Sequence, residues 1–560
     1  MQRLLIRLLL WLLIVIPYNY ASAQLNSQVV IPNLQKHIQT LASDKFEGRE
    51  TGQKGEQLSS DYIVKQFKEI GLSPKGVQEY LQAFPFTKNT KIGSKTNLIL
   101  DGIKLEVVTD FFPLAYSSSS STKGETVNVG YGIAAPKLDY DDYKLLKNLR
   151  GKIFVMEIST PDHAGPHSKY DEYADLRTRI DTAISKGAIA VIFINSDKDF
   201  LDPKPEYKNR ITPSTIPVVF VSIKQGKLLI NEKSYHVEIS VELEKELGTG
   251  HNVIGFINNE ATNTVIIGAH YDHLGYGGDE SLYRGEPKIH NGADDNASGT
   301  AALIELARYL KAVGSKNNNY LFIAFSGEEK GLLGSGYFVK NSTVDLSKIN
   351  YMLNMDMVGR LKTEDPTLLV NGVGTSDAWK VTMSFIKIDS LKIKTTESGI
   401  GPSDHTSFYL KNIPVLHFFS GTHSDYHKPS DDEPLINYPG EFRILNYMVQ
   451  LIAHLDDKGK INFIKTKDDS NEEAPRFKVT LGVIPDYAFD GEGMRIDGIS
   501  EGRPAAKAGL KAGDIVVAIG ENKVVDMTSY MRALGKFNKG DKTSVTVVRE
   551  KNEVKVEVVF

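Results

Sequence analysis

The 560-residue sequence predicts an α/β fold, with a mostly parallel mixed sheet sandwiched by helices, a β-rich inserted domain and a β-rich C-terminal module. Between residues 249 and 455, apolar runs such as "TVIIGAH" and "NYLFIAFS" alternate with helical patterns such as "GTAALIELARYLKAVG". Residues 105–248 and 476–560 hold short apolar runs separated by polar loops, with little helical pattern. The length favours about three domains.

The composition narrows the class of protein. The chain is 41% hydrophobic and 24% charged, which is ordinary for a soluble globular protein. Its net charge of −4 gives no reason to expect nucleic acid as a partner. It contains no cysteine, which excludes disulfides, thiolate nucleophiles, lipoprotein anchoring and cysteine-ligated zinc. Any metal site must therefore use His, Asp, Glu or backbone oxygen.

Residues 1–23 have the pattern of a signal peptide. Arg3 and Arg7 precede an apolar run, which Pro17 and the small residues up to Ala23 close. We expect cleavage after Ala23 and export to the periplasm or exterior of a bacterium, the alternative being a retained membrane anchor. No second stretch is apolar enough to span a bilayer, so no stable membrane insertion is expected after cleavage.

Two helices are expected in residues 24–104. Leu34, Ile38 and Leu41 share one helix face, and a second helix ends at Gly71. The glycine-rich segment "EGRETGQKG" connects them.

The other segments follow in order. Residues 105–248 form the β-rich insert with one helical pattern, "DLRTRIDTAISKG", and its His163 and His167 read as solvated loop residues. In residues 249–455, one helix places a row of apolar side chains on a single face: Ala302, Leu303, Leu306, Leu310 and Val313. Residues 456–475 are charged and, apart from one short patch, poor in large apolar groups, which predicts a linker.

Several predicted strands in residues 249–455 end in groups that can bind a metal. These are His270 with Asp272, the pair Glu328 and Glu329, and Asp356, together with Asp294 and Asp295 before a helix and a loop with His423, Asp425, Tyr426 and His427. Each alone has an ordinary explanation, such as a surface histidine, a solvated Glu pair or a helix N-cap. Because sites in α/β sheets form at the carboxyl ends of strands, their joint occurrence predicts a metal site.

The kinds of side chain indicate the metal. Imidazoles together with carboxylates suit zinc or a similar divalent ion. Five ligands exceed what one catalytic zinc takes, but they suit two ions that share a bridging carboxylate. This explains the adjacent acids in "HNGADDNASGT", although the spacing leaves open whether Asp294 or Asp295 bridges.

Five motifs in this order carry a resemblance: "GAHYDHLG", "NGADDNASG", "SGEEKGLLGS", "NMDMVGR" and "YHKPSDD". Residues 250–440 resemble the di-zinc exopeptidases, which include the bacterial leucyl-type aminopeptidases and the glutamate carboxypeptidases. The resemblance implies two zinc ions per chain. Its implied ligands are His270, Asp295, Glu329, Asp356 and His427, with Asp295 bridging.

The resemblance also implies roles in hydrolysis. Glu328 would be the general base, and Asp272 would orient His270. Tyr426 would donate to the oxyanion. Asp404 and His405 match a recurrent segment of the family, with structural support of the site as their interpretation. Pro402 stands where some relatives have an arginine that contacts substrate, which leaves recognition of the substrate's terminus open.

The two β-rich parts carry resemblances of their own. Residues 105–248 resemble a protease-associated domain, a non-catalytic lid or docking surface in relatives. Residues 476–560 resemble a bacterial-protease PDZ domain, in which Leu481, Gly482 and Val483 would accept a peptide C-terminus. A packing role is the alternative for this module.

The function expected is an exported zinc metallopeptidase that acts on peptides or proteins, most simply an aminopeptidase. A carboxypeptidase or dipeptidase could use the same site. A glutaminyl-cyclase-like enzyme with one zinc is a rival that the complete ligand set disfavours. Intact Glu328 argues against a non-catalytic peptide-binding relative, and an adaptor with slow activity is a further alternative.

Overall fold

The structure is a computed structural model. It describes residues 25–560 apart from these gaps: 163–168, 171–172, 197–199, 208–212, 231–232, 279, 284, 314–315, 467–478, 486–488, 490, 500–502, 526 and 538–539. The expected signal peptide, His163, His167 and the second half of the expected linker lie outside the described residues. Among the described residues, no helix combines enough length and apolar character to cross a bilayer.

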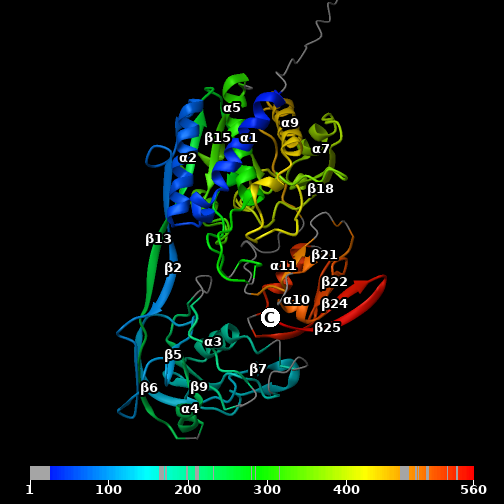
Figure 1. Cartoon of the computed structure of the whole chain (residues 1–560). Coiled ribbons are helices and arrows are strands. Elements are labelled where there is room, and N and C mark those ends of the chain that lie inside the picture. The colour runs from blue at the N-terminus through cyan, green and yellow to red at the C-terminus, as the bar shows by residue number, and fades with distance from the viewer. Residues whose placement is uncertain are drawn as a thin grey trace, which may run out of the picture.

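The large domain is built on a nine-stranded mixed sheet (Figure 1). Its strands lie in the order β1 (Ser73–Pro74), β13 (Leu243–Ile257), β15 (Asn318–Phe325), β14 (Asn263–His270), β16 (Ile349–Met355), β19 (Val415–Phe419), β17 (Thr367–Asn371) and β18 (Lys392–Thr396), and β2 (Leu81–Ile92) pairs with β13. The central strands β15, β14, β16 and β19 are parallel to one another. This confirms the expected α/β fold.

Helices cover both faces of this sheet. One face packs against α1 (Ser27–Leu41), α2 (Lys54–Ile70), α5 (Gly299–Val313), α7 (Asp377–Met383) and α9 (Tyr438–Leu455). The other packs against α6 (Leu333–Phe338) and α8 (His405–Tyr409). Because both faces are covered, β14 and β15 are buried along almost their whole length, which explains their continuous apolar runs.

The expected helices form, and one residue of the expected apolar face of α5 differs from the prediction. α2 ends at Ile70, and Gly71 follows in the left-handed conformation with φ of 81°. In α5 the expected apolar face is buried up to Leu310, whereas Val313 is 48% exposed because it is the last residue of the helix.

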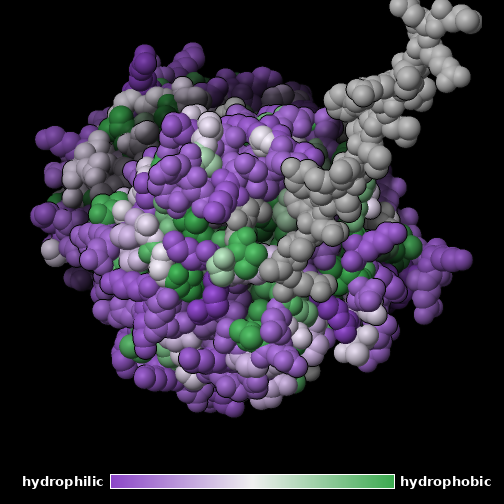
Figure 2. Space-filling view, turned by 90° about the horizontal axis from the view of Figure 1, so that it is seen from above, coloured by the Kyte–Doolittle hydropathy of each residue, from purple (hydrophilic) through white to green (hydrophobic). Residues whose placement is uncertain are grey.

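From above, the molecule is mainly hydrophilic with scattered hydrophobic side chains (Figure 2).

The inserted domain has an eight-stranded sheet. Its order is β4 (Ile103–Lys104), β3 (Asn97–Leu100), β12 (His236–Ser240), β6 (Ser121–Asn128), β9 (Ile153–Glu157), β10 (Ala190–Ile194), β11 (Val218–Val221) and β5 (Phe111–Pro113). Helices α3 (Leu176–Ser185) and α4 (Ile223–Leu229) and the short pair β7 (Ala134–Ala135) and β8 (Tyr140–Asp141) complete it.

The inserted domain begins earlier than the boundary expected at residue 105. Its sheet already includes β3 at Asn97–Leu100, which pairs with β12. The reason is that β2 and β13 form a long antiparallel ribbon, from Leu81 opposite Val253 to Ile92 opposite Leu243. This ribbon leads from the large sheet to the inserted domain (Figure 1).

The C-terminal module is a six-stranded sheet with two helices. It contains β20 (Val483–Pro485), β21 (Met494–Ile499), β22 (Ile515–Ile519), β24 (Lys542–Arg549) and β25 (Asn552–Val559) in this order, with β23 (Asn522–Lys523) beside β22 and the helices α10 (Pro504–Lys507) and α11 (Met527–Leu534). β20 is an edge strand of this sheet. The module has its own apolar core.

The first part of the expected linker belongs to the large domain. Asn350 donates from Nδ2 to the carbonyl of Gly459 at 2.8 Å and accepts at Oδ1 from the amide of Ile461 at 2.9 Å. Ile461 is buried, and Phe463 packs against Tyr409. The short apolar patch "INFI" thus anchors residues 459–466 to the large domain, so this part of the linker expected at residues 456–475 is packed.

Candidate metal centre

The parallel strands bring their carboxyl ends to one edge of the large sheet. His270 is the last residue of β14, and Asp356 directly follows β16. Glu328 and Glu329 follow β15 after a short turn. Since β15, β14 and β16 are neighbours, these side chains converge, as the strand-end pattern predicts.

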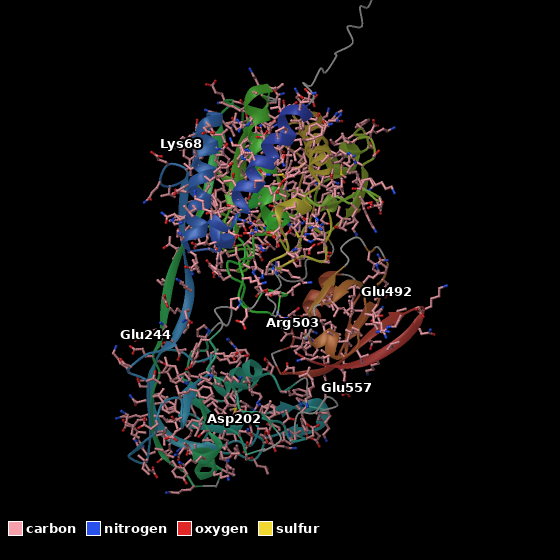
Figure 3. All side chains as sticks on the ribbon, in the orientation of Figure 1. Lys68, Asp202, Glu244, Glu492, Arg503 and Glu557 are labelled. Atoms are coloured by element: carbon pink, nitrogen blue, oxygen red, sulfur yellow. The ribbon has the colours of Figure 1, made fainter. Side chains whose placement is uncertain are left out.

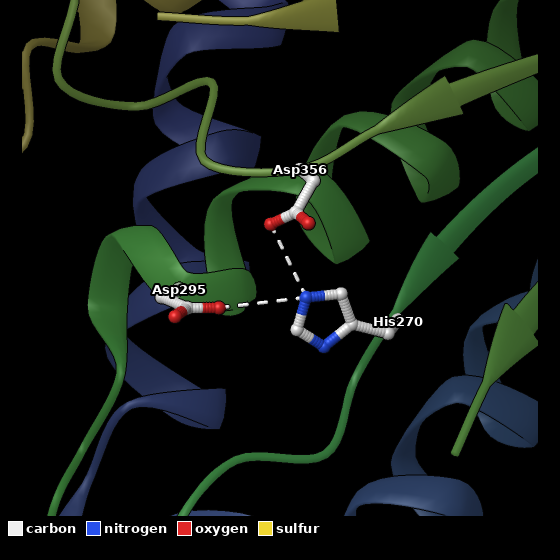
Figure 4. A group of neighbouring side chains, drawn as sticks. All are labelled: His270, Asp295 and Asp356. Atoms are coloured by element: carbon white, nitrogen blue, oxygen red, sulfur yellow. Dashed lines mark hydrogen bonds and ion pairs between the residues drawn. The ribbon is translucent and has the colours of Figure 1, made fainter. Parts of the chain in front are cut away.

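Two groups of side chains share Asp295. In the first group, His270 Nε2 lies 3.2 Å from Asp356 Oδ1 and 3.4 Å from Asp295 Oδ1 (Figure 4). In the second, His427 Nε2 lies 3.2 Å from both Asp295 Oδ2 and Glu329 Oε2. Each oxygen of Asp295 therefore faces one group, which is the arrangement expected of a bridging carboxylate.

The adjacent acids Asp294 and Asp295 point in different directions. Asp294 Oδ1 accepts from the amide of Gly359 at 2.7 Å, and its Oδ2 lies 3.2 Å from His423 Nε2. Asp294 is thus engaged in the protein interior, away from both groups, and Asp295 alone reaches them. The structure in this way separates two residues that the sequence pattern left equivalent.

A buried carboxylate fixes the loop that carries Asp295. Asp431 accepts at Oδ2 from the amides of Asp294 at 3.1 Å and Asp295 at 3.0 Å. Arg49, which is fully buried, donates to the carbonyls of Asn291 and Gly292 just before the pair. Both residues were missed by the sequence analysis, although Arg49 lies in the glycine-rich connection and Asp431 in the last motif.

His273 also lies at the centre, although it was not among the expected site residues. Its Nδ1 lies 2.7 Å from Glu329 Oε1 and 3.9 Å from Asp295 Oδ2. These three residues form one candidate metal-binding group of the described residues, and His270, Asp295 and Asp356 form another. The signal was present in "HYDHLG", where His273 follows Asp272 directly.

Asp272 lies next to His270 and to the turn that carries Glu328. His270 Nδ1 lies 3.2 Å from the backbone carbonyl of Asp272 and 3.7 Å from its carboxylate. The carboxylate accepts from Thr51 Oγ1 at 2.8 Å and from the amide of Glu328 at 3.2 Å. Asp272 is therefore placed to orient His270 through both its backbone carbonyl and its carboxylate, and it holds the turn that carries Glu328.

Three further expected residues lie close by. The ring of Tyr426 stacks on that of His427 with 3.9 Å between centroids. Asp404 is fully buried, and His405 stacks on His417 at 4.5 Å. Burial raises the pKa of Asp404 to about 7, and the negative charges of Asp272 and Asp356 add to this shift.

The electrostatics of the centre call for a cation. Burial and the nearby Glu329 raise the pKa of Asp295 to about 7. Burial also raises the pKa of Glu328 well above its usual value, with Asp356 and Glu329 adding to the shift. Burial alone would lower the pKa of His270, but Asp356 and Glu328 outweigh it and raise that pKa well above the usual value. Divalent cations would relieve this crowding of carboxylates.

Comparisons with known proteins identify family matches and related proteins for this chain. The model of peptidase family M28 matches residues 252–452, that of the PA domain matches 111–229, and that of the PDZ domain matches 461–559. The aminopeptidase YwaD of Bacillus subtilis is 31% identical over 265 residues, covering 44% of this chain and 53% of its own. An aminopeptidase of Pseudomonas aeruginosa is 24% identical over 348 residues, covering 60% and 58%.

Among solved structures, an aminopeptidase from Aneurinibacillus sp. strain AM-1 aligns with a TM-score of 0.45 and 23% identity, covering 79% of this chain and 96% of that chain. The chain spans a little over half the length of the two relatives described above. The family matches confirm all three resemblances seen in the sequence. Residues 252–452 match peptidase family M28, and the same chain also carries matches to a PA domain and a PDZ domain.

Proposed function

We propose that this chain is a zinc-dependent aminopeptidase that removes residues from the N-terminus of peptides. The observation that carries the proposal is the sharing of Asp295 between two groups, His270 with Asp356 and Glu329 with His427. The related proteins of Bacillus subtilis and Pseudomonas aeruginosa are aminopeptidases, which supports this specificity.

The donor set fits two zinc ions. Ligand atoms that lie about 2.0–2.2 Å from a tetrahedral zinc are about 3.3–3.6 Å from one another. The separations between ligand atoms within each group, 3.2–3.4 Å, agree with this spacing. When bound, the ions would polarise the peptide carbonyl and make water a better nucleophile.

Glu328 would act as the proton carrier. Its raised pKa allows the carboxyl to accept the proton of the attacking water and to deliver it to the leaving amine. The hydrogen bond from its backbone amide to Asp272 fixes the turn on which it lies. Tyr426, stacked on His427, would stabilise the oxyanion through its hydroxyl.

The test is to incubate the full purified chain with a mixed peptide library and to read the products by mass spectrometry, with zinc counted in parallel. We expect single residues to leave the N-terminus and about two zinc ions per chain. Release from the C-terminus would contradict the aminopeptidase specificity. A chain that binds no zinc would overturn the proposal, and one zinc without cleavage would favour the cyclase-like alternative.

The matched variants are Glu328→Gln and Glu305→Gln. Removing the proton carrier should lower kcat by about 10²–10⁴-fold and leave the zinc count unchanged. Glu305 is a buried carboxylate on α5 that contacts Asn33 and His37, so its change should alter stability while leaving kcat within about twofold. Equal activity of the Glu328 variant and the wild type would refute its role.

The PDZ domain would bind a peptide C-terminus. Because β20 is an edge strand, a peptide strand can pair with it. The side chain of Leu481 is buried in the core, so only its main chain and that of Gly482 and Val483 could hold a carboxylate. The amide of Gly482 donates to Thr480 Oγ1 at 3.0 Å, a contact that an incoming carboxylate would replace.

Export is the remaining part of the proposal. The signal-peptide pattern of residues 1–23 supports delivery to the periplasm or exterior of a bacterium. Sequencing the N-terminus of protein secreted from a bacterial host tests it, and we expect Gln24 as the first residue.

A further inference from the structure

We propose that His273 positions Glu329 by a hydrogen bond and thereby makes the two halves of the metal centre unequal, so that the Glu329–His427 half binds its ion more tightly than the His270–Asp356 half. This inference rests on the proposed function, because it requires that the centre hold metal. It assigns a role in metal affinity to a residue outside the expected ligand set.

The distances distinguish His273 from the expected ligands. His427 Nε2 lies 3.2 Å from both Asp295 Oδ2 and Glu329 Oε2, a spacing that fits two ligands on one ion. His273 Nδ1 lies only 2.7 Å from Glu329 Oε1, which is a hydrogen-bond distance and shorter than a ligand edge. It lies 3.9 Å from Asp295 Oδ2, which is longer than that edge. His273 therefore contacts Glu329 at Oε1, the carboxylate oxygen other than the one that faces His427.

Glu329 divides its two oxygens between the two imidazoles. Oε1 accepts the hydrogen bond from His273 Nδ1, and Oε2 faces His427 Nε2. A carboxylate held at one oxygen keeps the other pointed at the ion, which reduces the ordering entropy that metal binding would otherwise cost. Partners of this kind typically change metal affinity by about 10–100-fold when removed.

The ring of His273 is held in place by close packing. Its side chain is completely buried. It lies against Gly292, where an added Cβ would come 2.5 Å from His273 Cδ2. Gly292 has φ of 55° and precedes the loop that carries Asp295. Packing on this glycine fixes the direction in which Nδ1 donates.

The other half of the centre has a different arrangement. His270 is oriented by a backbone carbonyl, that of Asp272. Asp356 Oδ1 faces His270 Nε2, and Asp356 also accepts a hydrogen bond from the hydroxyl of Ser403, with the buried imidazole of His417 nearby. The donor to Glu329 is thus a completely buried imidazole, whereas the donor to Asp356 is a hydroxyl, and this difference predicts two separate steps of zinc release.

The test uses the full chain loaded with zinc and measures zinc equivalents retained against increasing concentrations of a chromophoric chelator. The variants are His273→Ala, which removes the donor, and His273→Asn, whose amide can donate from a position close to that of Nδ1. The matched control is His37→Ala. His37 is equally buried but contacts Tyr62 and Glu305, away from the centre.

For the wild type we expect two zinc equivalents released in two steps. His273→Ala should weaken the tighter step by about 10–100-fold, and His273→Asn should keep it within about fivefold. His37→Ala should lower Tm without changing either step, which separates lost stability from lost metal affinity.

Three results would overturn the inference. One is a folded His273→Ala variant with both steps unchanged. Another is a His273→Asn variant that loses as much affinity as the alanine variant. The third is a shift of the weaker step alone. A wild-type chain that binds two zinc ions in any of these cases would leave the proposed function standing, whereas a wild-type chain that binds none would overturn both.

Discussion

At the scale of single residues, side chains that are close in the sequence have different roles in the metal centre. Asp295 lies between the two groups of expected ligands, and Asp294 accepts the amide of Gly359 and contacts His423. The same separation occurs in "HYDH", where His270 faces Asp295 while His273 stands behind Glu329. Chemical type alone therefore does not assign a role in this centre.

The pair of aspartates gives the first prediction. Asp295→Asn should remove the negative charge shared by both groups and reduce bound zinc to less than one equivalent per chain. Asp294→Asn should keep both equivalents but lower the free energy of unfolding by about 1–3 kcal/mol, because a buried hydrogen-bonded carboxylate loses its match. Zinc counting and denaturant unfolding check both variants. Loss of zinc in the Asp294 variant but not in the Asp295 variant would contradict the assignment of Asp295 as the shared ligand.

A second prediction concerns acid stability of the PDZ domain. Arg549 donates to both oxygens of Asp514 at 2.6 Å. Burial alone would raise the pKa of Asp514, but the hydrogen bonds from Arg549 and the amide of Lys511 outweigh it and lower the pKa below 3.8. Since the folded pKa is below the unfolded one, the contact stabilises the fold above about pH 4, and this contribution is lost as the pH falls through the lowered pKa.

The measurement is the unfolding of the full chain between pH 3 and pH 7, monitored with a probe that is placed in the PDZ domain. Asp514→Asn should show a flatter pH dependence than the wild type below pH 4. An identical pH dependence in the two proteins would show that this ion pair does not contribute.

At the scale of elements, the centre depends on how a loop enters a helix. Gly299 begins α5, and a Cβ there would come 2.3 Å from Asn296 Oδ1 and 2.7 Å from the carbonyl of Met355. Its φ of −61° is ordinary, so glycine is required for space and not for conformation. The close approach ties the Asp295 loop to the end of β16, directly before Asp356.

Gly299→Ala should therefore push this loop away from the strand, weaken zinc binding and lower Tm. Gly336→Ala in α6 is the matched control, because nothing lies within 4 Å of the added Cβ. It should be neutral or more stable by up to about 1 kcal/mol, since alanine favours helix. The two variants are compared by zinc content and thermal unfolding, and similar behaviour of both would exclude the steric explanation.

At the scale of the whole molecule, the PDZ domain meets the peptidase domain near the metal centre. Arg503 lies between the two domains in Figure 3 and donates from Nη2 to the carbonyl of Ser281 at 3.2 Å. The adjacent segment holds His427, because the amide of Leu282 donates to the carbonyl of His427 at 2.9 Å and His427 Nδ1 lies 3.0 Å from the carbonyl of Glu280. A continuous set of contacts therefore joins the PDZ domain to an expected ligand.

Truncation separates these contributions. A chain that ends at residue 466 keeps the buried Ile461 but loses Arg503, so we expect activity on short peptides within about fivefold of the full chain, which corresponds to about 1 kcal/mol for one hydrogen bond. A chain that ends at residue 458 also loses Ile461 and the contacts of Asn350, and its Tm should fall clearly further. Equal Tm values for the two truncations would contradict the anchoring role of residues 459–466.

The amino-acid sequence by itself determined the fold class and the strand ends that meet at the metal centre. His270, the pair Glu328 and Glu329, and Asp356 could be identified because apolar runs mark the strands and parallel strands end at a common edge. Which glutamate is the ligand was implied only by the family resemblance. The spacing of apolar residues located α2 and α5, because the residues that a helix buries recur every three or four positions along the chain.

The residue pattern left Asp294 and Asp295 equivalent, and the family resemblance alone pointed to Asp295. The tertiary structure supplied the geometry that separates them, and only the tertiary structure decided that His273, Asp431 and Arg49 support the centre. These residues lie on irregular loops, where no periodicity fixes the direction of a side chain. Their partners are distant in sequence, such as Asp431 for the amide of Asp295 and Glu329 for His273. The packing role of residues 459–466 was missed for the same reason, because a short apolar patch reveals its partner only when the chain has folded against it.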